Sequence, residues 1–166
     1  VTVSISSCSD GDVTVPPVPT LEGEWHTFNR TFKSDDKKLE ERINSLLRED
    51  LRVYDIVKIY KEVEIGIGTI SEASYKKNSS DPQEDRLNPG TFEVNTRQDT
   101  IKLDMQRGGQ IVARMTLNAA SLITEIDANK AYIDFITSEI GGDVTLNPEG
   151  SKGTFTFVER KQTSLP

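Results

Sequence analysis

The chain has 166 residues and a formal net charge of −7, from 27 Asp and Glu residues against 20 Lys and Arg residues. This length predicts one domain with a tail, large enough to bury a core without disulfides or metals. The acidic balance argues against a nucleic-acid partner, because phosphate binding draws on clustered Lys and Arg. No apolar run approaches the roughly 20 residues of a membrane span, and a single Cys excludes an internal disulfide and a Cys-based zinc site.

Residues 1–20 have the composition of a tether rather than of a packed element. They show no helical period, and three of the chain's seven prolines fall at Pro16, Pro17 and Pro19. Proline fixes φ and favours an extended polyproline II path. We therefore place the domain boundary at about Leu21 and assign residues 21–166 to one globular domain.

Cys8 lies in this tail and is preceded by Ile5-Ser6-Ser7. The segment resembles a bacterial lipobox, in which an aliphatic residue and two small residues precede a Cys that is lipidated and becomes the mature N-terminus. The resemblance implies that Val1–Ser7 is the stub of a signal peptide, and that acyl chains on Cys8 hold the protein on a membrane. A free Cys in a tail is the alternative. The acidic run Ser9–Asp12 is similar to a surface-export signal of some Gram-negative lipoproteins, although solvation of a tail explains it equally well.

The globular part opens with a predicted strand and a predicted helix. Residues 21–32, LEGEWHTFNRTF, are rich in apolar and β-branched residues, which is typical of a strand. Ser34, Asp35 and Asp36 then form a helix start with acidic groups near the positive end of the helix dipole. The apolar residues that follow are spaced as one face of an amphipathic helix over 35–51. These residues are Leu39, Ile43, Leu46, Leu47 and Leu51.

The apolar period then changes to two, which indicates strands with one buried face. The face expected to be buried carries the odd-numbered residues Val53, Val57, Ile59, Val63, Ile65 and Ile67. Gly66 and Gly68 are expected to mark a bulge or a close approach of backbones. Residues 71–90 are mostly polar and carry two prolines, so most of this stretch is predicted to be a long loop.

From Gly90 onward the pattern is that of a β-meander with turns at Gly108-Gly109 and at Asp127–Lys130. The predicted strands lie around Phe92–Val94, Ile101–Met105, Ile111–Leu117, Leu122–Ile126, Tyr132–Ile136 and Gly153–Arg160. Eight to ten short strands in all suggest a closed antiparallel barrel or a sandwich. We favour an all-β, up-and-down barrel with one helix after the first strand, because closure removes aggregation-prone sheet edges.

Gly23 and Trp25 in the first strand, together with Arg160 at the end of the last strand, resemble the lipocalin-like (calycin) signature. In that family a Gly-x-Trp sits at the closed end of the barrel, and the resemblance implies that Arg160 packs across the ring of Trp25. Arg160 has the opposite strand parity to Phe155 and Phe157, so this contact requires a bulge. The domain looks like small lipocalin-like lipoproteins of Gram-negative bacteria over about residues 21–161. An ordinary core aromatic is the alternative for Trp25.

The sequence offers no complete catalytic constellation. Nucleophilic catalysis needs a nucleophile, a base and an orienting group. The only His, His26, is expected to point outward because it follows an inward Trp25. The Ser-x-x-Lys spacings that begin at Ser34 and Ser74 lack the partner motifs of acylases, and the acidic residues near Asp81 lack the spacing of a calcium loop. We therefore predict no enzyme activity, no cofactor and no metal.

Two binding roles stay open. In the first, the barrel binds a small apolar ligand inside, under a lid formed by the helix at 35–51 or the loop at 76–88. The residues expected to line that site are Phe92, Val94, Leu103, Met105, Ile111, Met115, Phe155 and Phe157. In the second, a solid barrel serves as a binding or scaffolding lipoprotein that contacts an envelope protein partner. In both, the expected address is the outer membrane, held through the lipid anchor alone, on the periplasmic side or the surface.

Overall fold

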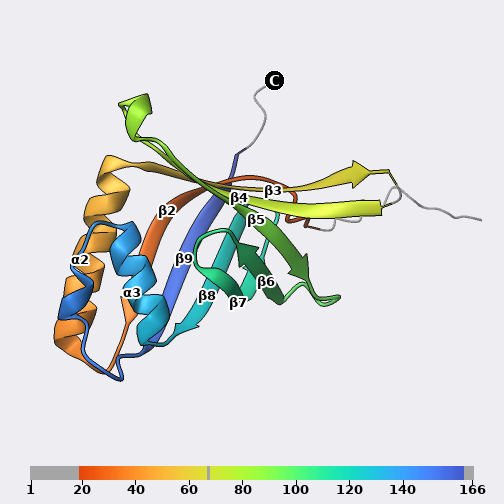
Figure 1. Cartoon of the computed structure of the whole chain (residues 1–166). Helices are drawn as coiled ribbons and strands as arrows, with labels where there is room; N and C mark the ends of the chain where they lie inside the picture. The colour runs from red at the N-terminus through yellow and green to blue at the C-terminus, as the bar shows by residue number, and fades with distance from the viewer. Residues whose placement is uncertain (1–18, 67, 163–166) are drawn as a thin grey trace, which may run out of the picture.

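A computed structural model describes residues 19–66 and 68–162, which form a closed antiparallel barrel of eight strands with two α-helices and two short 3₁₀ helices (Figure 1). The strands are β2 (Gly23–Lys33), β3 (Asp55–Ile65), β4 (Gly68–Asn78), β5 (Arg86–Val94), β6 (Thr100–Met105), β7 (Gly109–Leu117), β8 (Ser121–Ala128) and β9 (Gly153–Lys161). The helices are α2 (Lys37–Val53), α3 (Lys130–Glu139), η1 (Pro82–Glu84) and η2 (Val144–Leu146).

The barrel is closed by pairing between its first and last strands. Each strand pairs with the next one in the chain, and β2 pairs with both β3 and β9. This confirms the predicted all-β, up-and-down, lipocalin-like barrel with an amphipathic helix after the first strand. Of the tail and tether predicted at 1–20, residues 1–18, which include Cys8, lie outside the described residues.

The helix predicted at 35–51 is α2, displaced by two residues. Asp36 is its N-cap, and the Asp36 carboxylate accepts a hydrogen bond from the backbone N–H of Leu39 at 3.1 Å. Its apolar face buries Leu39, Ile43 and Leu47, and α2 packs mainly against β2. Figure 1 shows α2 and α3 together at one end of the barrel. No described helix is both long and apolar enough to cross a membrane.

Strand β2 contains a β-bulge that changes which of its residues face inward. Its pairing with β9 shifts register between Thr27 and Asn29. Before the bulge the buried residues are Trp25 and Thr27, and after it they are Arg30 and Phe32. Odd-numbered side chains therefore enter the barrel first and even-numbered ones afterwards.

Strand β3 corrects the prediction of its buried face. The pocket inside the barrel is bordered by the even-numbered Lys58 and Tyr60, whereas on the predicted odd-numbered face Val57 is buried and Ile59 and Val63 are half-buried. Val53, which was assigned to that face, belongs to α2 and is 47% exposed. The prediction was wrong because it treated Lys58 as a surface residue, whereas an aliphatic stem with a buried counter-ion fits a barrel interior.

The long loop predicted at 71–90 was also wrong, because β4 and β5 occupy most of it. The sequences of these two strands are mostly polar for two reasons. Their outer face meets solvent, and their inner face includes Lys77 and Asn88, which are buried and hydrogen-bonded. Gly66, with φ of +54°, lies where β3 ends and the chain returns as β4, so it marks a turn rather than a bulge within a strand.

In the C-terminal half, the predicted strand at Tyr132–Ile136 is the helix α3. Asn129 caps it, because its side-chain oxygen accepts from the N–H of Tyr132 at 3.0 Å. The other predicted strands of this half are confirmed as β5 to β9. The hairpin predicted at Gly108-Gly109 is confirmed as well, with φ values of +95° and +69° that suit glycine.

Candidate functional site: a pocket under helix α3

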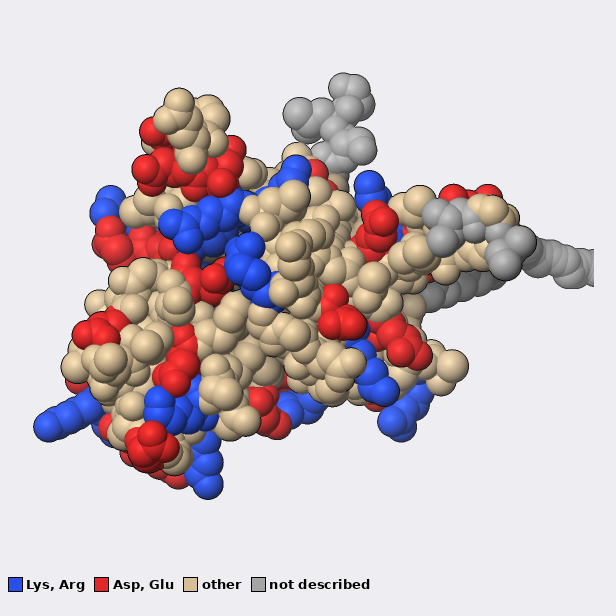
Figure 2. Space-filling model, in the orientation of Figure 1, with Lys and Arg blue, Asp and Glu red and all other residues tan. Residues whose placement is uncertain are grey.

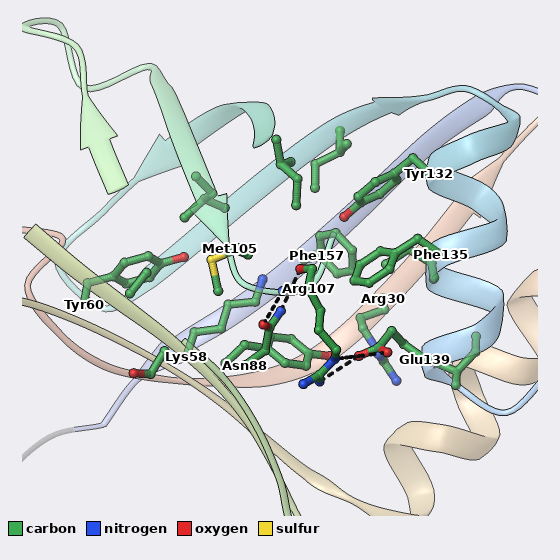
Figure 3. Close-up of a pocket in the computed structure, with 18 residues that line it drawn as sticks. Arg30, Lys58, Tyr60, Asn88, Met105, Arg107, Tyr132, Phe135, Glu139 and Phe157 are labelled. Carbon is green, nitrogen blue, oxygen red and sulfur yellow. Dashed lines mark hydrogen bonds and ion pairs between the residues drawn. The ribbon is translucent and has the colours of Figure 1, made fainter. Parts of the chain in front are cut away.

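A pocket of about 90 Å³ lies inside the barrel beneath α3 (Figure 3). Its wall is mostly apolar. The strands supply Ala73, Leu103, Met105, Ile111, Ile126 and Phe157, and α3 with the residue after it supplies Phe135, Ile136 and Ile140. The volume equals that of about three water molecules, at roughly 30 Å³ each in the liquid. The barrel interior beside the helix therefore has room for only a small molecule.

The predicted lining residues divide into two groups. Leu103, Met105, Ile111 and Phe157 border the pocket. Phe92, Val94, Met115 and Phe155 belong to or pack against the hydrophobic core without bordering it. The lid differs from both predictions, because α3 covers the pocket, whereas α2 lends no lining side chain and the 76–88 segment lends only Asn88.

Three tyrosines, Tyr60, Tyr75 and Tyr132, border the pocket. Among the residues that the structure describes, none forms a hydrogen bond with any of these three hydroxyl groups. Burial raises the pKa of Tyr75 to about 12 and raises the pKa of Tyr60 and Tyr132 further. All three hydroxyls therefore stay protonated at neutral pH and can donate to a bound molecule.

A buried ion pair lies at one side of the pocket. The Lys58 Nζ is 3.0 Å from Oε2 of Glu159, whose side chain has no exposed surface. Thr27 donates to the same Oε2 at 3.2 Å, while Oε1 has no hydrogen-bond partner in the described structure. The ammonium of Lys58 also lies 4.5 Å from the centre of the Phe157 ring. Lys58 is thus held over an aromatic floor inside the barrel.

A second buried cluster joins α2 to the barrel wall. Arg30 Nη2 and Lys77 Nζ lie 2.9 Å and 2.7 Å from the two carboxylate oxygens of Asp50, and all three side chains are nearly inaccessible. Arg30 Nη2 also donates to the carbonyl of Leu47, while its Nε has no partner in the described structure. Burial lowers the pKa of Lys77, although the hydrogen bond that Lys77 donates to Asp50 acts in the opposite direction.

The rim of the pocket is tied to α3 by polar contacts, drawn as dashed lines in Figure 3. Arg107, in the turn between β6 and β7, lies 3.0 Å from Oε1 of Glu139 at the end of α3. The side chain of Asn88 holds the backbone of Arg107, accepting from its N–H at 2.9 Å and donating to its carbonyl at 3.0 Å. Lys77 reaches α3 as well, through the Glu139 carbonyl at 3.1 Å.

The predicted signature residues are only partly arranged as expected. Trp25 is fully buried, and its indole N–H donates to the carbonyl of Leu21 at 2.8 Å. The cation nearest its ring is Lys161, whose Nζ lies 5.4 Å from the ring centre, whereas Arg160 lies over Phe28. The predicted Arg160–Trp25 contact is therefore wrong.

The correction has a geometric reason. Arg160 opposes His26 and Lys161 opposes Trp25 in the pairing of β9 with β2. No register shift occurs between Phe155 and Phe157 or at Arg160, so the bulge that the predicted contact required is not present in this strand. Gly23 makes room for the actual neighbour, because a Cβ at this position would approach Cε of Lys161 to 2.8 Å.

The remaining candidates for catalysis, His26 and the Ser74–Lys77 pair, are not arranged as a catalytic site. His26 lies on the outer surface between Glu24 and Asp55, at 2.9 Å and 3.3 Å. Burial alone would lower the pKa of His26, but these two hydrogen bonds outweigh it and raise the pKa. Ser74 and Lys77 lie on opposite faces of β4, because their sequence separation is odd. This separation prevents a Ser–Lys pair.

Acidic side chains gather at the tip of the connection between β4 and β5, as Figure 2 shows. They are the exposed Asp81, Glu84 and Asp85 around η1. The described residues contain no group of three or more His, Cys, Asp or Glu side chains placed to hold a metal ion.

The molecule is an antiparallel, closed β-barrel with a small internal pocket and a helical cover. Comparisons with protein-family models, with curated protein sequences and with solved structures return no match.

Proposed function

We propose that the barrel binds a small, mainly apolar ligand in the pocket beneath α3. The observation that carries this proposal is a gap of about 90 Å³ with an apolar wall, placed next to a helix that could act as its cover. A well-packed core leaves few voids larger than a water molecule. Apolar cavities take up small apolar molecules in preference to water, so a gap of this kind favours a binding role over a purely structural core.

The size of the pocket limits what binds without rearrangement. An engineered apolar cavity of about 150 Å³ accommodates benzene, and the pocket here is smaller. A larger ligand requires α3 to move and to break the contact between Arg107 and Glu139. These side chains are 42% and 23% exposed, so this contact contributes no more than about 1 kcal/mol. Breaking this one contact is therefore inexpensive, whereas a movement of the whole helix would also disturb the fully buried Ile133 and Thr137.

The proposal concerns binding rather than catalysis. Lys58 and Arg107 are held in ion pairs with Glu159 and Glu139. The phenols at the pocket have raised pKa values, which suits hydrogen-bond donation and not proton abstraction at neutral pH. These features support a non-enzymatic role that requires no metal or cofactor.

The test is a titration of the isotope-labelled protein with xenon and with benzene, followed by methyl NMR. Binding in the pocket is expected to shift the methyl signals of Leu103, Ile111 and Ile126, which border it. The methyl signals of Ile43 and Leu47, in the core of α2, serve as the internal control. No shift with either probe would overturn the proposal and favour the alternative, a solid barrel that contacts an envelope protein through its surface.

The cellular address is a separate proposal that rests on the sequence. We propose that the protein is a lipocalin-like lipoprotein held outside the cytoplasm, on the outer membrane, by acyl chains on Cys8. The lipobox-like residues before Cys8 and the prolines after it support this assignment. Membrane contact through lipid alone is consistent with described helices that are too short or too polar to span a bilayer.

A further inference from the structure

We infer that the projecting half of the β3–β4 hairpin is an interface between two copies of this chain, which pair edge to edge along the first residues of β4. This interface goes beyond the proposed function and does not depend on the pocket. It follows from the strand pairing, from the charges on each edge of the hairpin and from the placement of one exposed isoleucine.

The β3–β4 hairpin extends past the strands on both sides of it. Toward the turn, β2 pairs with β3 no further than Tyr60, and β5 pairs with β4 no further than Glu72. Beyond these points residues 61–65 and 68–71 lie in a ribbon of two described strands only. Figure 1 shows this ribbon projecting from the barrel while β5 turns away from β4. We call these residues the projecting ribbon.

The projecting ribbon has two outer edges, and they differ in how far their backbone groups are occupied. A two-stranded ribbon is marginally stable alone, and each edge presents unpaired N–H and C=O groups. On the β3 edge, the carboxylate of Glu22 accepts a hydrogen bond from the backbone N–H of Glu62 at 3.0 Å. On the β4 edge, residues 68–71 have no backbone hydrogen-bond partner outside β3 in the described structure. The β4 edge can therefore accept another strand.

The charges on the two edges favour β4 for self-association. The β4 edge has the sequence Gly-Thr-Ile-Ser over residues 68–71, so it has no charge and two β-branched residues that suit strand pairing. The β3 edge carries Glu62 and Glu64. Two copies of that edge centred on Val63 would place these carboxylates opposite one another, which is destabilising.

The contact is self-complementary when it is centred on Ile70. In a two-fold symmetric dimer, residue i opposes residue j and residue j opposes residue i. Antiparallel pairing about Ile70 therefore places the two Ile70 side chains side by side, next to Val63, the cross-strand partner of Ile70 on the same face. On the other face Thr69 lies opposite Ser71, and the two hydroxyls can hydrogen-bond. Ile70 is 37% exposed and Val63 is half-buried, so the contact buries apolar surface that one copy leaves in water.

The test is sedimentation velocity of the full chain from about 20 μM to about 1 mM, because so short a contact belongs to the class of weak interfaces. We expect the sedimentation coefficient to rise with concentration toward that of a dimer. Ile70→Lys places two like charges opposite each other and should weaken self-association by roughly tenfold or more. Leu87→Lys, at an apolar residue of β5 that is 51% exposed, is the matched control and should leave self-association unchanged.

Two outcomes of this experiment would overturn the inference. One is a chain that stays monomeric at the highest concentration. In such a monomer, protection of the amides of residues 68–71 from hydrogen exchange would identify another segment of the same chain as the occupant of the edge. The other outcome is equal weakening by the two lysine variants, which would assign self-association to a different surface.

A cysteine cross-link tests the register separately. In a Cys8→Ser background, Ile70→Cys places two thiols on directly opposite residues, within the roughly 7 Å between Cα atoms that a disulfide needs. Mild oxidation should then give covalent dimers. Val63→Cys should not cross-link, because three strand spacings of about 4.8 Å separate the two copies of this residue. Val112→Cys, exposed on β7, measures random encounter. Cross-linking through Val63→Cys alone, or through neither ribbon variant above the Val112→Cys rate, would contradict pairing along β4.

Discussion

The position of the pocket predicts opposite stability changes for the same substitution at two alanines that are almost equally buried. Ala73 on β4 borders the pocket, whereas Ala113 on β7 lies in the core away from it, and their exposed fractions are 3% and 2%. We expect Ala73→Leu to be tolerated or stabilising and Ala113→Leu to be destabilising. The same chemical change at equal burial thus has opposite effects, because only one site has empty space beside it.

The magnitude follows from the volume. Leucine adds three carbon atoms, whose combined size is close to that of the three waters that the 90 Å³ pocket could hold. Burying them contributes up to about 2.4 kcal/mol at ~0.8 kcal/mol per CH₂, and ordering the side chain costs about 0.5–1 kcal/mol. Imperfect fit reduces the remainder, so the expected gain for Ala73→Leu is about 0.5–1.5 kcal/mol. Overpacking at Ala113 is expected to cost about 1–3 kcal/mol.

Urea denaturation followed by the fluorescence of Trp25, the only tryptophan and a fully buried one, measures both variants. The two free energies of unfolding should differ by about 1.5–4.5 kcal/mol. Ala73→Leu should also abolish xenon and benzene binding. Equal destabilisation of both variants, with probe binding intact, would refute the reasoning, because it would mean that Ala73 borders no usable space.

Three further predictions concern the buried ion pairs, the pH dependence of stability and the attachment of the protein to a membrane. Asp50→Asn leaves Arg30 and Lys77 without their shared carboxylate, and we expect urea denaturation to show a loss of about 3–5 kcal/mol. Because its folded-state pKa is raised, His26 should contribute stability that is full below the unfolded pKa of about 6.5 and lost as pH rises through the folded pKa. At this surface position the contribution is under about 1 kcal/mol, measurable by thermal unfolding between pH 6 and 8. Cys8→Ser, expressed behind a lipoprotein leader peptide, should abolish labelling by a palmitate analogue and release the protein from the membrane fraction.

Each of these has its own control. Asp85→Asn at the exposed tip of η1 should leave stability within about 0.5 kcal/mol, and a similarly small loss for Asp50→Asn would contradict the importance of the buried cluster. His26→Gln should flatten the pH dependence between pH 6 and 8, and an unchanged slope would assign that dependence to other groups. A parent protein that incorporates no palmitate analogue would refute lipidation.

The elements predicted correctly from the sequence are those in which polar and apolar residues separate cleanly. The helix α2 carries Leu39, Ile43 and Leu47 on one face and a capping Asp36 before it, so local signals agree with the final packing. Strands β7 and β8 alternate in the same clear way. Polar and apolar residues alternate in these strands because one face of each packs against the core, as it does in almost any barrel.

The elements predicted incorrectly have interior positions that are not hydrophobic. Strands β4 and β5 place Lys77 and Asn88 inside the barrel. Polar residues therefore occur on both faces of these strands, and no alternation of polar and apolar residues is visible in the sequence. The helix α3 is short and rich in Ile and Phe, and a run of this length has no decisive period, although Asn129 was a usable cap signal.

The candidate site was only partly predictable for the same reason. Apolar lining residues such as Met105 follow from alternation, whereas Arg30, Lys58 and Glu159 would be assigned to the surface from residue type alone. Their partners lie 20 or more positions away in the chain, and no local pattern reports such a pairing. Glu159 falls on the same face of its strand as Phe155 and Phe157, and a carboxylate at such a position is the signal that could have indicated a buried partner.

The bulge in β2 has a consequence for how this barrel tolerates change. Phe28 is the extra residue opposite β9, and it allows both Trp25 and Arg30 to enter the interior although their separation is odd. Deleting that one residue would reverse the orientation of one half of the strand relative to the other. Arg30 and Phe32 would then face solvent, or Trp25 would. The interior chemistry of this barrel therefore depends on the number of residues in its first strand as much as on their identity, and insertions or deletions there should be tolerated far less than substitutions.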